Sequence, residues 1–323
     1  MNVLSLFDGM SCGRIAFEKS NFNIDNYYAY EIDKYAIEAT LHNFPDVQEL
    51  GDVFNADFTK HNNIDWLIGG SPCTYWSIAQ SPDKRETTAS GFGWDLFLQY
   101  VRALHEAKPN FFIYENNKSM SKDIYRSISQ TFGFEPIMIN SALVSAQNRR
   151  RFYWIGRKTV EGKYEKIIVK QPADKGILLN DILDSGENLT GDDKSHCLTA
   201  RYDGAHVSNT IERRQRTMVA EPIDINSIDK DNIYKVENGI ITIKDKSYPI
   251  KLNDGYYTIR KLTIDECKAL QTVPKWYDFS CVSKTQAYKM LGNGWTVDVI
   301  VHILNQVHFQ MNDGFKQGMK KLF

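Results

Sequence analysis

Short apolar segments alternate with amphipathic segments through the first half of the chain, and this alternation restricts the possible folds more than any other feature. The apolar segments predict strands at residues 3–7, 26–31, 64–69, 111–115, 137–143 and 152–155. The amphipathic segments predict helices at residues 13–19, 34–44 and 96–107. Strands and helices in turn, at this spacing, predict an α/β fold with a doubly wound, Rossmann-like parallel sheet. Ligands of such sheets bind at the carboxyl ends of the strands.

The composition of the chain changes after about residue 157. Residues 158–258 are richer in Asp, Asn, Lys and Gly, with short β-like pieces at 240–243 and 256–259, which predicts a smaller, irregular β-rich domain. Helical periodicity returns at residues 263–271 and 295–311, and the last helix is expected to pack back on the first domain. The predicted domains are therefore residues 1–157, residues 158–274, and a segment 275–323 that completes the first domain.

Composition excludes several classes of protein. Of the 323 residues, 42% are hydrophobic and 24% are charged, as is usual for a soluble globular protein. The chain has neither a long uncharged apolar stretch nor a signal peptide, so no membrane contact and a cytoplasmic location are expected. The five cysteines are scattered and include no CxxC pair, which argues against a disulfide framework or a metal site.

The charge of the chain is nearly balanced, with a formal net charge of −1. This balance argues against a protein coated in nucleic acid, so local clusters of charge carry more information than the net charge. Basic residues gather at 149–151 with 157–158, at 213–216, and at 316 with 320–321. Each cluster could face phosphates, and an ordinary solvated surface is the alternative for each.

Three features in the first two strand–helix units suggest a nucleoside cofactor. A turn of small residues, from Phe7 to Gly13, joins the first strand to the first helix and lets backbone N–H groups approach a ligand closely. The second strand ends in Glu31, which is placed to accept hydrogen bonds from ribose hydroxyls. The next junction carries Asp52, which is placed to accept from the amine of an adenine. Each carboxylate alone is more often a helix cap or a surface residue.

Cysteine, glutamate and arginine side chains lie at or near further strand ends in the same half of the chain. Cys73 follows an apolar strand, two glycines and a proline, and Glu115 ends the next strand. Strict alternation would place Gln147, Arg149 and Arg151 on one face of the strand that follows. Taken singly, a cysteine is more often a small buried residue and an arginine pair is more often exposed.

The combination of these three residue types points to chemistry on a cytosine ring. Attack on carbon 6 of cytosine needs a thiolate, and a carboxyl group is needed to protonate ring nitrogen 3. An arginine helps by holding the base and by tuning the acid. The chain supplies all three on neighbouring strand ends.

Nine motifs follow one another in an order that argues against chance. They are Phe7-Asp8-Gly9, Glu31, Asp52, Gly70-Ser71-Pro72-Cys73, Leu96-Phe97, Glu115-Asn116, Gln147-x-Arg149-x-Arg151, Arg260-Lys261-Leu262-Thr263 with Glu266 and Leu270-Gln271, and Leu291-Gly292-Asn293. By these motifs the chain resembles the cytosine-5 DNA methyltransferase family of bacteria and phages from end to end, outside a variable region near 160–258. Taken individually, only the Pro-Cys and Gln-x-Arg-x-Arg motifs are specific.

The resemblance implies a role for each matched residue. Cys73 would be the nucleophile, Glu115 the acid at nitrogen 3, and Arg151 the group that holds the base, with Arg149 beside it. The implied cofactor is S-adenosylmethionine, and no metal is expected. Its implied binding residues are Phe7, Asp8, Gly9, Met10, Ser11, Cys12, Glu31, Ile32, Asp52, Val53, Leu96, Asn293 and Trp295.

The resemblance also implies a substrate and a domain plan. A methyltransferase sheet would carry catalysis, the β-rich domain would recognise a target sequence in duplex DNA, and the cytosine would be flipped out of the helix. Residues 74–93 are polar, basic and bounded by glycines, which suits a mobile loop that closes on DNA; a plain surface loop is the alternative. A monomer in a bacterial or phage-infected cell is expected, and a restriction endonuclease is a candidate partner.

Two departures from the family pattern stand out. Asn117 occupies the position of the usual valine in Glu-Asn-Val, and Ser11-Cys12-Gly13 replaces the paired glycines of many bacterial members. Three other functions remain open: an RNA (tRNA) cytosine-5 methyltransferase, a catalytically inactive DNA-binding relative, and a small-molecule methyltransferase. The sizeable variable domain favours DNA over tRNA, and the presence of Cys73, Glu115 and Arg151 argues against an inactive relative.

Overall fold

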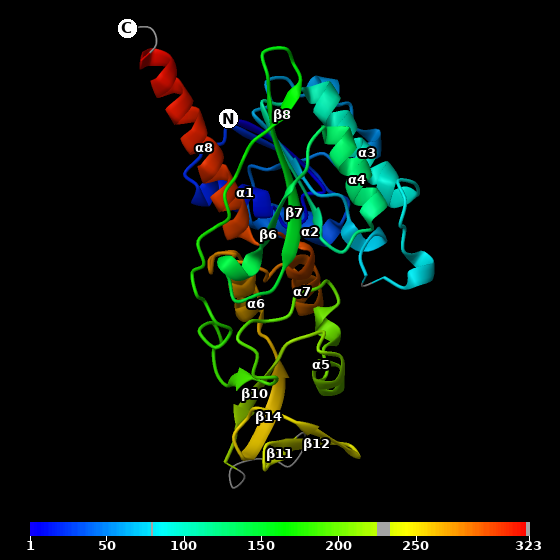
Figure 1. The fold of residues 1–323 in the computed structure, drawn as a ribbon, viewed down its shortest axis with the longest axis vertical. Coiled ribbons are helices and arrows are strands. Elements are labelled where there is room, and N and C mark those ends of the chain that lie inside the picture. The colour runs from blue at the N-terminus through cyan, green and yellow to red at the C-terminus, as the bar shows by residue number, and fades with distance from the viewer. Residues whose placement is uncertain (79, 225–232, 321–323) are drawn as a thin grey trace. The chain divides into compact units, whose positions relative to one another are not determined.

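The computed structural model describes residues 1–78, 80–224 and 233–320, with side chains described as far as residue 310. The chain forms two compact units (Figure 1). Unit 1 comprises Met1–Asn140, Arg150–Pro172 and Val297–Phe323. Unit 2 comprises Ser141–Arg149 and Ala173–Thr296.

The boundaries of these units differ from the predicted domain boundaries. Residues 141–149 and 275–296, expected in the large domain, belong to unit 2, and residues 158–172, expected in the small domain, belong to unit 1. The reason is long-range hydrogen bonding. Ser145 Oγ and Gln147 Nε2 both donate to the carbonyl of Leu270, at 2.7 and 2.9 Å. The catalytic and target-recognition roles of the two parts stay predictions.

Unit 1 is built on an eight-stranded sheet in the order β3-β2-β1-β4-β5-β7-β6, with β8 paired to β7. Its strands are β1 (Asn2–Leu6), β2 (Asn26–Tyr30), β3 (Gln48–Glu49), β4 (Trp66–Gly69), β5 (Phe111–Asn117), β6 (Ile137–Asn140), β7 (Arg150–Lys158) and β8 (Tyr164–Lys166). The strand predicted at residues 137–143 ends already at Asn140, because the chain continues as a 3-10 helix, η5 (Ser141–Leu143).

The strands from β3 to β5 run parallel, and β6, β7 and β8 are antiparallel to their neighbours. From β1 the chain proceeds outward through β2 to β3, then returns to the other side of β1 with β4 and β5. The strand order therefore reverses between β1 and β4. In open α/β sheets ligands bind at the carboxyl ends of the strands at such a reversal. The turn at 7–13 and the Cys73 segment both leave the sheet at this place.

Helices cover both faces of this sheet (Figure 1). The helices of unit 1 are α1 (Cys12–Lys19), α2 (Lys34–Asn43), α3 (Phe92–Ala107), α4 (Lys122–Phe132) and α8 (Val297–Lys320), with 3-10 helices η1 (Val53–Asn55), η2 (Phe58–Lys60), η3 (Cys73–Tyr75) and η4 (Pro82–Lys84). Helix α8 packs against α1, and Lys19 Nζ contacts Asp298 Oδ1 at 2.5 Å. The predicted return of the last helix to the first domain is therefore confirmed.

Side-chain alternation assigns each strand residue to one face. Leu4, Leu67 and Phe112 are fully buried in an aromatic-rich core with side chains of α3 and α4. Trp66, of opposite parity, packs edge-on against Phe17 of α1, with 5.9 Å between ring centroids. The odd-numbered residues of β5 therefore share the α1 face, and Glu115 is one of them.

Unit 2 contains a six-stranded antiparallel sheet in the order β13-β12-β11-β14-β10-β9. Its strands are β9 (Glu187–Asn188), β10 (Met218–Pro222), β11 (Ile233–Glu237), β12 (Ile240–Ile243), β13 (Lys246–Pro249) and β14 (Gly255–Lys261). Its helices are α5 (Val207–Arg213), α6 (Ile264–Leu270) and α7 (Lys284–Asn293), with the 3-10 helix η6 (Tyr202–Gly204). The prediction of a parallel α/β sheet together with a smaller β-rich part is confirmed. None of the described helices is long and apolar enough to span a membrane.

Candidate active site

Cys73 opens the short helix η3, just past the end of β4. The connection from β4 is tied to β5 by polar contacts, since Ser71 Oγ lies 2.7 Å from Tyr114 Oη and Asn116 Nδ2 donates to the Ser71 carbonyl at 3.1 Å. The Cys73 carbonyl accepts from Trp76 N at 3.1 Å, which closes the helical turn. The Cys73 side chain is half-buried at the strand end, as the sequence predicted.

Glu115 lies against the same connection. A Cβ atom on Gly70 would come within 2.8 Å of Glu115 Oε2 and 2.7 Å of the Glu115 carbonyl oxygen. Real Cβ atoms essentially never make such contacts, so the residue at position 70 must lack a side chain for the carboxylate to occupy this place. The Gly-Ser-Pro-Cys motif thus makes room for Glu115 as well as presenting Cys73.

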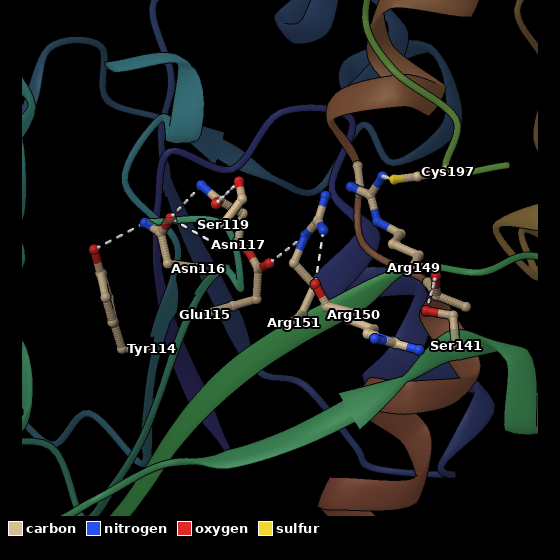
Figure 2. A network of polar contacts seen from close by, with 12 residues as sticks. Tyr114, Glu115, Asn116, Asn117, Ser119, Ser141, Arg149, Arg150, Arg151 and Cys197 are labelled. Atoms are coloured by element: carbon tan, nitrogen blue, oxygen red, sulfur yellow. Dashed lines mark hydrogen bonds and ion pairs between the residues drawn. The ribbon is translucent and has the colours of Figure 1, made fainter. Parts of the chain in front are cut away.

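Glu115 and Arg151 form an ion pair, with Arg151 Nε 3.0 Å from Glu115 Oε1 (Figure 2). Strand pairing explains the contact, because Asn117 lies opposite Arg151 in the β5–β7 register and Glu115 is the diagonal neighbour on the same face. The two side chains are only 11% and 14% exposed. Arg151 Nη1 also donates to the Arg150 carbonyl at 2.9 Å, which orients the guanidinium.

Arg149 lies just before β7, which begins at Arg150. The prediction that alternation places residues 147, 149 and 151 on one face stays a prediction. Arg149 is buried in unit 2, where its guanidinium donates to the carbonyls of Leu198, Gly292 and Gly294 at 2.9, 3.2 and 2.8 Å. These contacts give Arg149 a structural part in unit 2, and a catalytic part for it stays a prediction.

The turn after β1 has an unusual backbone. Phe7, Gly9 and Ser11 have φ values of 57°, 60° and 57°, and left-handed conformations at non-glycine residues cluster at functional sites. The Asp8 carboxylate stabilises this turn from inside by accepting from Ser5 Oγ at 2.5 Å, from Tyr27 Oη at 2.7 Å and from Ser11 Oγ. Burial raises the pKa of Asp8, while these hydrogen bonds oppose the rise. The Asp8 carboxylate therefore organises the turn.

Glu31 joins the end of β2 to this turn. Its carboxylate accepts from Gly9 N, Ile32 N and Asp33 N, each at 2.8 Å. Ile32, next to it, is 74% exposed, which is unusual for an isoleucine beside a rigid turn. Asp52 caps η1 by accepting from Phe54 N at 3.0 Å. Glu31 and the turn at residues 7–12 are thus brought together as the sequence predicted.

The other predicted cofactor residues fall into three groups. Val53 and Leu96 are buried in the core of unit 1 beneath the strand ends. Asn293 and Trp295 belong to unit 2, so their contact with the cofactor stays a prediction. Met10 and Cys12 are buried within the turn and the start of α1.

Three residues near these strand ends were not predicted from the sequence. Phe54 and Phe92 are 41% and 50% exposed and stack on each other, with 5.8 Å between ring centroids. Both carboxylate oxygens of Glu49 are buried and have no hydrogen-bond partner in the part of the chain that the structure describes. The sequence carried a signal for the first two only, since Phe54 lies two residues after the matched Asp52 and Phe92 lies four residues before the matched Leu96. Among the described residues, no group of three or more His, Cys, Asp or Glu could hold a metal ion.

The comparisons with known proteins agree with this geometry. The model of a family described as C-5 cytosine-specific DNA methylase matches residues 1–308. The chain belongs to this family. The orphan methyltransferase M.SPRI of Bacillus phage SPR is 34% identical over an alignment of 172 residues, which covers 48% of this chain and 37% of that protein. The type II methyltransferase M.Bsp6I of a Bacillus strain is 24% identical over 328 residues, covering 96% of this chain and 99% of the relative.

Solved structures show the same fold. The Entamoeba histolytica methyltransferase EhMeth has a TM-score of 0.65 at 16% identity and covers 96% of this chain and 98% of its own. The S. pombe Dnmt2 methyltransferase has a TM-score of 0.62 at 14% identity, with 97% and 99% covered. The predicted methyltransferase fold is confirmed, and the family resemblance drawn from the motifs is confirmed with it.

Proposed function

We propose that this member of the C-5 cytosine-specific DNA methylase family transfers a methyl group to carbon 5 of a flipped-out cytosine in a specific duplex DNA sequence. The observation that carries the proposal is the arrangement at the ends of β4 and β5. There Glu115 lies against Gly70, three residues before Cys73, and pairs with Arg151. A thiol, a shielded carboxyl group and a guanidinium are what addition to a cytosine ring requires.

Cys73 acts as the nucleophile in this proposal. As a thiolate, its sulfur forms a bond to carbon 6, and the electron pair of the 5,6 double bond moves to carbon 5 as Glu115 protonates ring nitrogen 3. After carbon 5 has been methylated, it loses its proton to a base and the electron pair of that bond restores the 5,6 double bond. The Cys73 thiolate leaves, and nitrogen 3 returns its proton to the Glu115 carboxylate. Arg151 holds the Glu115 carboxyl group in place, because its Nε lies 3.0 Å from Oε1.

The turn after β1 fits S-adenosylmethionine, which supplies the methyl group when bound. Phe7, Gly9 and Ser11 have left-handed backbone conformations, and the Asp8 carboxylate is held inside the turn by the Tyr27 hydroxyl. Glu31 would hold the ribose and Asp52 the adenine amine, while the exposed Ile32 side chain would cover the adenine ring. Phe54 and Phe92 add apolar surface beside Asp52.

Unit 2 would recognise the target sequence, with exposed basic side chains such as Arg201 and Arg213 available for phosphates. A base inside a duplex cannot be reached by a side chain at a strand end, so the cytosine must leave the stack. A monomeric state, a cytoplasmic location and a paired restriction endonuclease stay predictions.

Bisulfite sequencing of DNA from cells that express the chain tests the proposal. We expect protected cytosines within one short sequence for the wild type and for Cys281→Ser, which changes another half-buried cysteine, in unit 2. We expect none for Cys73→Ala. Methylation assays of the purified protein on duplex DNA and on tRNA accompany this test. Activity on tRNA alone, or protected cytosines with Cys73→Ala, would overturn the proposal.

A further inference from the structure

Polar contacts connect the end of β5 to the segment that follows Cys73. This segment is described at residues 74–78 and 80–93, and it runs from η3 into the first turn of α3. Residue 79 lies outside the described residues. The sequence predicted a loop that moves as DNA binds, so the contacts that fix its conformation matter for the proposed function.

Asn117 is the first link in this connection. It is the last residue of β5 and only 4% exposed, and its side-chain nitrogen donates to Asn116 Oδ1 at 3.2 Å. Its oxygen accepts from Ser119 Oγ at 2.6 Å (Figure 2). Asn116 in turn donates to the Ser71 carbonyl, two residues before Cys73. Valine is the usual residue at this position in the family that the chain resembles. A valine at position 117 could make neither side-chain contact.

Ser119 is the second link, and it contacts the segment through two groups. Its hydroxyl oxygen accepts from Ile78 N at 3.4 Å, and its carbonyl accepts from Arg85 Nη2 at 2.5 Å. Arg85 Nε also donates to the Trp76 carbonyl at 3.2 Å, so one guanidinium joins both arms of the segment to residue 119. A planar guanidinium, with several donors in a fixed arrangement, is suited to such a bridge.

Further contacts reinforce the same conformation. Ser121 Oγ donates to the Thr87 carbonyl at 2.5 Å. The Glu86 carboxylate accepts from the Trp76 indole at 3.2 Å and from Gly93 N at 3.1 Å, and Trp76 is fully buried. The segment is therefore attached to residues 117–121 on one side and closed on itself on the other.

We infer that Asn117 and Ser119 are positioning residues for the methyl transfer, which hold the segment after Cys73 in register with the strand that carries Glu115. The inference deepens the proposed function and rests on it, because the segment matters to catalysis only if Cys73 does. Neither residue is assigned a contact with substrate. Their effect passes through Ile78 and Arg85 to the segment, and through Asn116 to Ser71.

Limited trypsin digestion tests the inference without any need for activity, because Lys84 and Arg85 lie in the segment. We expect Ser119→Ala and Asn117→Val to be cut after these residues roughly three- to tenfold faster than the wild type, as expected for the loss of one or two hydrogen bonds. Thr88→Ala is the matched control, since its hydroxyl contacts Ser90 Oγ within the segment. The melting temperature of each variant, measured in parallel, separates local release from general unfolding.

Cleavage of Ser119→Ala at the wild-type rate would overturn the inference, whatever Asn117→Val does. An equal acceleration in Thr88→Ala, or an acceleration accompanied by a matching fall in melting temperature, would overturn it as well. Steady-state methylation gives the second readout: the Ser119→Ala defect should appear mainly in KM for duplex DNA, with kcat less affected. An inactive wild type with accelerated cleavage of the variants would refute the proposed function while leaving the anchoring contacts supported.

Discussion

Glu115 is restrained from two directions, by the guanidinium of Arg151 at 3.0 Å and by the open Cα face of Gly70. A carboxyl group held in this way can give a proton to a base at one defined position, which is what general acid catalysis needs. The restraint comes from strand pairing and from a glycine, so it exists before any substrate binds.

The Glu115→Gln variant keeps the shape of this side chain and removes its acid function. We expect methylation of duplex DNA to fall by about 10²- to 10⁴-fold, the usual contribution of a positioned acid. Glu165→Gln is the matched control, because Glu165 pairs with Arg157 of β7 at 2.6 Å with both side chains about half exposed. Initial rates with radiolabelled methyl donor measure both variants. Equal losses in the two variants would contradict a specific role for Glu115.

Glu49 is a buried carboxyl group beside the proposed cofactor turn. Burial raises its pKa to about 8, and the negative charges of Asp8 and Glu31 add to the rise. Because the pKa in the folded protein exceeds its ordinary value, folding favours the protonated form. The resulting stability is present below about pH 4.5 and is lost as the pH rises through about 8.

The Glu49→Gln variant should remove this pH dependence. We expect the melting temperature of the wild type to fall by a few degrees relative to the variant as the pH rises from about 6 to about 9. Differential scanning calorimetry at several pH values provides the measurement. Parallel curves for the two proteins would show that Glu49 titrates normally.

At the scale of elements, α6 is held by its first turn. Thr263 and Glu266 form a capping box, and the Glu266 carboxylate, 1% exposed, also accepts from Arg260 Nη1 at 2.8 Å and from Asp184 N at 2.9 Å. The Arg-Lys-Leu-Thr motif of the sequence therefore serves to join β14 to α6 within unit 2.

Two substitutions in α6 should differ in cost. Removing the cap with Thr263→Ala should lower the free energy of unfolding by about 1 kcal/mol. Glu266→Gln should lower it by about 2 kcal/mol or more, because two hydrogen bonds of the Arg260 guanidinium lose their charged acceptor while the ion pair with Glu221 stays. Urea unfolding of the two variants measures the order. A Glu266→Gln variant as stable as Thr263→Ala would contradict this account of the motif.

Local patterns predicted most strands and several helices, and the misses have physical reasons. Helix α4 was not predicted, although Ile124, Ile128 and Phe132 have helical spacing and Ser121 caps its first turn. The antiparallel insertion of β7 between β5 and β6 could not be predicted, because strand pairing depends on partners far along the chain. The contacts of Arg149 could not be predicted for the same reason, because its partners lie at residues 198, 292 and 294.

At the scale of the molecule, the sequence predicted two parts of different architecture, and the structure divides the chain into two units of these kinds. The exact division escaped prediction because residues 141–149 leave the sheet to join unit 2 through Ser145 and Gln147. The candidate site was more predictable than the boundaries. Its central residues lie in unit 1 at consecutive strand ends. The order of the motifs along the chain is enough to predict this position.

The central claim is that Cys73 forms a covalent bond to cytosine in DNA. Incubation with S-adenosylmethionine and duplex DNA containing 5-fluorocytosine tests this claim most directly, because fluorine at carbon 5 blocks the elimination that would release the sulfur. The account predicts a complex that survives denaturation, with mass spectrometry locating the adduct on the peptide that contains Cys73, and no complex for Cys73→Ala. A wild type that forms no adduct, or a Cys73→Ala variant that still forms one, would contradict it.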